Sequence, residues 1–133
     1  MEYRGVPLFE ENGKFGVLVS PGFGAGWSTW GESQLAYDKR IIEFWLFHKD
    51  DEEFMRTVRD YGYRGAPASE AYQEAEKFFE SIGFDECPYM GGFKNLKLVF
   101  VKPGVPWRIT EYDGSESLET LDNAGFITFG GEE

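Results

Sequence analysis

The chain has 133 residues, a net charge of −11 and a hydrophobic content of 41%. This length and composition suit one domain with its own core, which we predict to span residues 1–133. The acidic charge argues against direct binding to nucleic acid or to a membrane surface, because both need Lys and Arg side chains. The single Cys excludes an internal disulfide. Because the chain also has only one His, we predict neither a metal nor a cofactor. Without a signal peptide or an apolar run of the ~20 residues that a membrane helix needs, we place the chain in the cytoplasm.

The first part of the chain predicts a hairpin followed by helices. Apolar runs at 6–9 and 15–20 flank Asn12-Gly13, a pair typical of tight hairpin turns. The second run is apolar on both faces, as in an inner strand, and it leads directly into a glycine-rich segment. Apolar spacing then predicts one helical turn within 32–38 and helices over 39–49, 54–61 and 69–82. We expect Asp38 and Ser69 to cap the helices that follow them.

From residue 95 onward the apolar period changes to that of strands. Segments 96–101 and 107–112 predict a second hairpin, because Lys102-Pro-Gly-Val-Pro106 between them has turn chemistry. Asp113-Gly114 then turns the chain into a third strand over 115–121, and 126–129 is a last short strand. This order predicts an α+β domain with a mixed or largely antiparallel sheet of about five strands and two or three helices packed on one face.

Two segments have the most unusual composition of the chain. The first is Gly22-Phe-Gly-Ala-Gly-Trp-Ser-Thr-Trp30, and the second is Gly104-Val-Pro-Trp-Arg-Ile-Thr-Glu-Tyr-Asp-Gly-Ser-Glu116. Together they resemble a group of small uncharacterised proteins encoded by bacteriophages and prophages, in which a variable helical middle separates two such segments. The resemblance implies an origin in a virus or mobile element and a setting in the bacterial cytoplasm, and it brings no assigned activity. We predict that the two segments lie side by side in the fold.

The glycine-rich segment allows three interpretations. Glycines after a strand suit a phosphate-binding loop, but the Lys-Ser/Thr of a Walker loop and the spacing of a dinucleotide fold are missing. We favour a tight loop in which Trp27 and Trp30 close one end of the core. The third interpretation is an exposed aromatic surface that contacts a partner or a ring-shaped ligand. The direction of the two tryptophan side chains decides between the last two.

The C-terminal segment concentrates acidic residues. Seven acidic residues and no basic residue occur after position 108, namely Glu111, Asp113, Glu116, Glu119, Asp122, Glu132 and Glu133. In a continuous strand, Glu111 and Asp113 would project to the same face and hold a cation or act as an acid/base pair. A hairpin turn at Asp113-Gly114 is the simpler interpretation, and it is the one we favour.

These observations favour a non-enzymatic binding module that contacts a host protein with a basic surface. A small-ligand protein that binds a nucleotide or a sugar through the glycine-rich segment is the alternative, and a carboxylate- or metal-assisted hydrolase ranks third. No spacing links Cys87 with His48 as a nucleophile and base. The predicted contact residues are Gly24, Gly26, Trp27, Trp30, Trp107, Glu111, Tyr112, Asp113 and Glu116.

Overall fold

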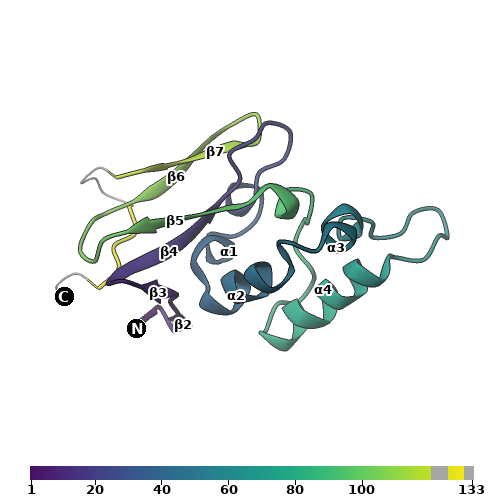
Figure 1. Ribbon diagram of the computed structural model, residues 1–133, viewed down its shortest axis with the longest axis horizontal. Coiled ribbons are helices and arrows are strands. Elements are labelled where there is room, and N and C mark those ends of the chain that lie inside the picture. Colours follow the sequence, from purple (N-terminus) through teal and green to yellow (C-terminus); the bar gives the residue numbers. More distant parts are fainter. Residues whose placement is uncertain (121–125, 131–133) are drawn as a thin grey trace.

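Strand β4 (Lys14–Val19) is the central element of the computed structural model, which describes residues 1–120 and 126–130. It pairs in antiparallel fashion with β3 (Glu10–Glu11) on one side and with β5 (Lys97–Val101) on the other. All its residues from Phe15 to Val19 are buried, which confirms the prediction of an inner strand that is apolar on both faces. Figure 1 shows β4 and β5 between the β6–β7 hairpin on one side and α2 on the other.

The remaining strands form two separate hairpins. Strand β1 (Glu2–Tyr3) pairs with β2 (Val6–Pro7), and β6 (Arg108–Tyr112) pairs with β7 (Ser115–Glu119). The described residues therefore form an α+β domain with seven short strands in three antiparallel sheets, rather than one sheet of about five strands. Segment 126–129 contributes only an isolated bridge between Trp107 and Ile127.

The predicted hairpin between segments 96–101 and 107–112 is wrong. Strand β5 pairs with β4, which lies far away in the sequence, and β6 pairs with β7. Pro103 and Pro106 lie between the two segments and have no N–H group. They therefore cannot donate the backbone hydrogen bonds that would pair these segments next to the turn. The Gly104 N–H instead donates to the Phe129 carbonyl at 2.7 Å. The chain thus passes from one sheet to the next.

The two predicted turns join paired strands, although the first strand of the N-terminal hairpin is Glu10–Glu11 and not the apolar run 6–9. Asn12-Gly13 joins β3 to β4 and Asp113-Gly114 joins β6 to β7, and all four residues have positive φ angles between 52° and 86°. These are the angles that a two-residue hairpin loop needs. Arg4 and Gly5 adopt the same conformation between β1 and β2, which the sequence did not suggest.

Side-chain caps fix where the longer helices begin. The helices are α1 (Gln34–Tyr37), α2 (Lys39–His48), α3 (Glu52–Thr57) and α4 (Glu70–Ser81), with 3-10 turns η1 (Ser28–Trp30) and η2 (Phe93–Asn95). Asp38, Asp51 and Ser69 cap α2, α3 and α4 as hydrogen-bond acceptors, which confirms two predicted caps. Helix α3 ends at Thr57 rather than near residue 61, and the Thr57 carbonyl accepts the Asp60 N–H at 2.9 Å and the Ser69 hydroxyl at 2.7 Å. None of the helices described is both long and apolar enough to cross a bilayer.

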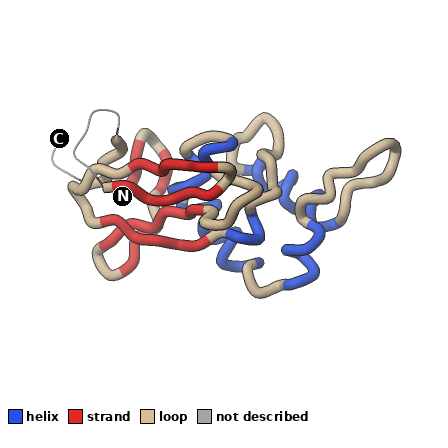
Figure 2. Tube along the Cα trace, turned by 90° about the horizontal axis from the view of Figure 1, so that it is seen from above, coloured by secondary structure: helices blue, strands red, loops and turns tan. Residues whose placement is uncertain are grey.

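Strand β4 separates two hydrophobic cores. Leu18 faces the larger core, in which the helices α2, α3 and α4 gather around Phe79 and Phe93. Phe15, Val17 and Val19 alternate with it and face the second core, which contains Trp107 and Phe129. Figure 2 shows the strands gathered toward one end and the helices toward the other, with the loop between α3 and α4 projecting beyond the helices.

Candidate functional site

Glu116 is a buried carboxylate that ties β7 to the glycine-rich loop. Its side chain is only 2% exposed and accepts four hydrogen bonds. The Ser20 N–H donates to Oε1 at 2.9 Å, and the Trp27 N–H donates to Oε2 at 2.7 Å. Thr29 donates to the same oxygen twice, through its N–H at 3.1 Å and its hydroxyl at 2.6 Å. Hydrogen bonds to an ionised acceptor are strong, so these donors stabilise a charge that burial alone would disfavour.

Backbone contacts extend this connection along the loop. The Glu116 N–H donates to the Ser20 carbonyl at 2.7 Å, and the Gly24 N–H donates to the Asp113 carbonyl at 2.9 Å. The Ser115 hydroxyl, at 2.8 Å, donates to the carbonyl of Pro21. The prediction that the two unusual segments lie side by side is therefore confirmed.

The two tryptophans of the loop point in different directions. Trp27 is 1% exposed, and its Nε1 donates to the Leu35 carbonyl at 2.8 Å, so it closes the end of the core as expected. Trp30 is 43% exposed and its ring centroid lies 5.7 Å from that of Tyr89. The Trp30 Nε1 lies 3.4 Å from Glu111 Oε2. The expectation that both tryptophans close the end of the core is therefore confirmed for Trp27 and wrong for Trp30.

The structure divides the predicted contact residues into two groups. Gly24, Trp30, Glu111, Tyr112 and Asp113 are exposed, whereas Gly26, Trp27, Trp107 and Glu116 are buried. The buried four are not part of the exposed surface in this conformation, so they support that surface from within the fold. Phe23, which is 69% exposed and packs 6.4 Å from Tyr112 between ring centroids, was not among the predicted residues. We call the surface formed by Phe23, Trp30, Glu111, Tyr112 and Asp113 the loop end.

Two backbone donors of the loop are already engaged by Glu116. A phosphate-binding loop offers free N–H groups to an anion. Here the N–H groups of Trp27 and Thr29 both donate to the Glu116 carboxylate, which occupies the place that a phosphate oxygen would take. A nucleotide phosphate would have to displace this buried carboxylate, so these two amides do not favour the nucleotide alternative.

The four acids of the C-terminal quarter that the structure describes do not form a continuous acidic surface. Glu116 is buried, and Glu119 pairs with Arg108 at 2.7 Å between Oε1 and Nε. Strand β6 ends at Tyr112, and Asp113 lies in the turn that follows. The alternation of side chains along a strand therefore does not place Asp113 beside Glu111. Glu111 itself accepts the Gly114 N–H at 2.7 Å. The remaining predicted acids, Asp122, Glu132 and Glu133, lie outside the described residues.

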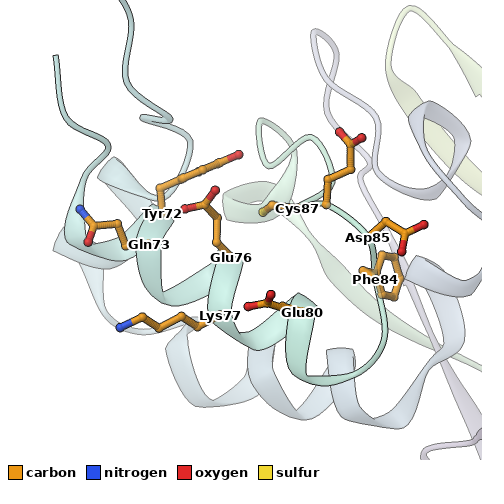
Figure 3. Close-up of a pocket in the computed structure, with 9 residues that line it drawn as sticks. Tyr72, Gln73, Glu76, Lys77, Glu80, Phe84, Asp85 and Cys87 are labelled. Atoms are coloured by element: carbon orange, nitrogen blue, oxygen red, sulfur yellow. The ribbon is translucent and has the colours of Figure 1, made fainter. Parts of the chain in front are cut away.

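An acidic groove of about 530 Å³ lies elsewhere, between α4 and the segment that follows it (Figure 3). It is lined by Tyr72, Gln73, Glu76, Lys77, Glu80, Phe84, Asp85, Glu86 and Cys87. Sequence reasoning missed this groove. A signal was present, since Tyr72, Glu76 and Glu80 recur every four residues and so share one face of the helix. The three-dimensional structure was needed to show that residues 84–87 lie alongside this face of α4.

Burial of the thiol raises the pKa of Cys87 to about 11, and the nearby Glu76 carboxylate acts in the same direction, while the Tyr72 hydroxyl opposes both. We expect iodoacetamide to alkylate Cys87 of the folded protein at pH 8 at least about tenfold more slowly than the chain in denaturant, where a thiol pKa is about 8.5. The rate in the folded protein should rise with pH toward about 11. The unfolded chain loses the thiol proton at a lower pH than the folded protein does. The free energy of unfolding should therefore fall as the pH rises from about 8.5 to about 11. Mass spectrometry of quenched samples measures the rate, and equal rates in both states would contradict the burial of this thiol.

His48 has a packing role in this fold. Its side chain is 5% exposed and its ring stacks on Phe54, with the centroids 3.7 Å apart. Glu74 Oε2 lies 3.0 Å from Nε2, without the alignment of a hydrogen bond. In the part of the chain that the structure describes, no three His, Cys, Asp or Glu side chains are grouped so that they could hold a metal ion.

Comparisons of the chain with protein-family models, with curated proteins and with solved structures find no match.

Proposed function

We propose that the chain is a non-enzymatic binding module that contacts a basic surface of another protein through the loop end. The observation that carries this proposal is the set of four hydrogen bonds to Glu116, which hold the loop in one conformation. Trp30 and Phe23 are exposed on that loop next to the acidic residues Glu111 and Asp113. A surface that is ordered before binding loses less entropy when the complex forms.

The composition of the loop end suits protein recognition. Aromatic side chains contribute much of the energy of protein interfaces, and three exposed rings lie here, those of Phe23, Trp30 and Tyr112. The carboxylates of Glu111 and Asp113 would attract a basic partner and speed its association. The resemblance to phage and prophage proteins supplies the proposed setting, in which the partner is a host protein in the bacterial cytoplasm.

One observation favours the small-ligand alternative. A cavity of about 240 Å³ lies behind the loop and is lined in part by Ser28, Thr29 and Trp107. Within the described residues, Trp107 Nε1 is buried and has no hydrogen-bond partner, so a small ligand with an acceptor group would satisfy it. This cavity is smaller than most sites for drug-sized ligands, which span about 300–1,000 Å³.

Affinity capture from a bacterial lysate tests the proposed function. The loop-end variant carries Phe23→Ser, Tyr112→Ser and Asp113→Asn, which remove two exposed rings and one charge and leave Glu116 in place. A control variant with Phe47→Ser, Tyr63→Ser and Glu43→Gln makes the same kinds of change at other exposed positions. We expect the wild type and the control to retain a protein that the loop-end variant loses at least about tenfold, with weaker capture at high salt.

Two outcomes would contradict the proposal. The loop end is not the contact surface if both variants capture the same proteins equally well. A small-ligand function would be indicated if no protein is captured while a nucleotide or a sugar raises the melting temperature of the wild type.

A further inference from the structure

A groove lined by aromatic residues lies beside the acidic groove. It has a volume of about 270 Å³ and is lined by Arg59, Tyr61, Tyr72, Cys87, Pro88, Tyr89, Met90 and Gly91. Tyr61 is 61% exposed and Tyr89 is 55% exposed, although both are large apolar side chains. Rings exposed at the edges of a groove are typical of a binding surface.

The aromatic groove adjoins the acidic groove on one side and the loop end on the other. It shares Tyr72 and Cys87 with the acidic groove, so a chain that occupies one groove can extend into the other. The Tyr61 and Tyr72 rings lie 6.3 Å apart between centroids. On the other side, Tyr89 packs against Trp30 of the loop end. One ring pair, Tyr61 with Tyr72, thus lies on the side of the aromatic groove near α3, and a second pair, Tyr89 with Trp30, lies on the side of the loop end.

The charges of the two grooves differ. Glu76, Glu80, Asp85 and Glu86 line the acidic groove together with a single basic residue, Lys77. In Figure 3 the Lys77 side chain points away from Glu76 and Cys87. Across residues 1–120 and 126–130, none of the four carboxylates forms an ion pair with a Lys or Arg side chain. The acidic groove therefore offers negative charge that the described part of the chain does not neutralise, whereas Arg59 makes the aromatic groove less favourable for a cation.

We propose that the two grooves together bind one extended segment of a partner protein, in which Lys or Arg residues adjoin a large apolar residue. The basic side chains lie against the carboxylates of the acidic groove, and the apolar side chain lies between Tyr61 and Tyr89. Arg59 determines this order, because a second cation beside it would be repelled. The inference rests on the proposed binding function, and it names the part of the partner that meets this side of the molecule.

A labelled peptide tests the inference with the full chain. The probe has the sequence Arg-Ala-Arg-Ala-Leu-Ala-Leu, and its binding is measured by fluorescence anisotropy at low salt. We expect binding that weakens at least about tenfold with Glu76→Gln and Glu86→Gln together, and by a similar factor with Tyr61→Ser. Glu10→Gln with Glu43→Gln makes the same change in net charge at exposed positions outside the grooves, and it should leave the affinity unchanged.

A second measurement does not depend on variants. Cys87 lines both grooves, so a saturating amount of the probe should slow its alkylation at pH 9 at least about fivefold. A probe that fails to bind the wild type overturns the inference. Equal weakening by the groove and control variants shows attraction by net charge alone and also overturns it, as does equal binding of a probe with Ser in place of Leu.

The peptide experiment and the capture experiment can fail separately. The loop-end variant keeps every residue of both grooves, so it should bind the probe as the wild type does. If the variant binds the probe normally but captures the same proteins as the wild type, the proposed contact surface at the loop end fails while the groove inference stands. If capture depends on the loop end but the probe does not bind, the groove inference fails and the proposed function stands.

Discussion

Glu116→Ala is expected to lower the free energy of unfolding by about 4 kcal/mol, because it removes the acceptor of four hydrogen bonds, and a hydrogen bond to a charged group contributes about 1.5–3 kcal/mol. The substitution leaves the N–H groups of Ser20, Trp27 and Thr29 without their acceptor. Each buried donor that loses its partner costs about 1–3 kcal/mol, less where water can enter. Urea unfolding followed by tryptophan fluorescence measures the change.

A neighbouring glutamate on the same strand provides the control. Glu119 pairs with Arg108 at the surface, where an ion pair contributes at most about 1 kcal/mol, so Glu119→Ala should have a small effect. Glu116→Gln keeps the volume of the side chain but places an NH₂ group against N–H donors, so it should also destabilise the protein strongly. If Glu116→Gln unfolds at the same urea concentration as the wild type, the carboxylate is not what holds the loop.

Loss of Glu116 should also affect binding at the loop end. Trp30 is positioned by the same loop that carries Trp27 and Thr29, and both of these donate to Glu116. A loop released from this carboxylate would have to become ordered again when a partner binds. A Glu116 variant that remains folded should therefore capture its partner more weakly, although Glu116 itself is buried.

Local features of the fold followed from the sequence. Asp38 and Ser69 begin helices, and the Asn12-Gly13 and Asp113-Gly114 pairs form hairpin turns, because caps and tight turns depend on residues within a few positions of one another. The pairing of β5 did not follow, since its partner β4 is distant in the sequence and the turn residues after β5 suggested a hairpin. Competition between a local turn and a distant strand is decided by packing of the whole core.

The role of Glu116 was only partly visible in the sequence. As one of seven acids in a segment without bases, it was grouped with surface charges. Strand alternation contained a different signal, because Glu116 and Leu118 lie on one face of β7, and Leu118 pairs with Ile109. A glutamate on an apolar face needs hydrogen-bond donors, and the fold provides them from a loop that lies about 90 residues away in the sequence. The position of Tyr89 beside Trp30 depends in the same way on distant contacts.

Gly114→Ala should destabilise the protein by about 3 kcal/mol, from a combination of backbone strain and a steric clash. Gly114 has a φ angle of +86°, which disfavours any residue with a Cβ. A Cβ at this position would lie 2.6 Å from the Ala25 backbone nitrogen and 3.0 Å from two backbone atoms of Gly24. The turn would have to move away from the loop, and the hydrogen bond from Gly24 to the Asp113 carbonyl would lengthen or break.

Gly13→Ala separates the two contributions. Gly13 occupies the equivalent position of the Asn12-Gly13 turn with a φ angle of +76°, and no atom lies within 4 Å of where its Cβ would be. This variant should therefore cost only the strain of the positive φ angle, about 1 kcal/mol. Urea unfolding of both variants gives the difference, and hydrogen exchange of the Gly24 amide reports whether the loop has separated from the turn. Equal losses of stability with unchanged exchange at Gly24 would show that the turn does not press on the loop.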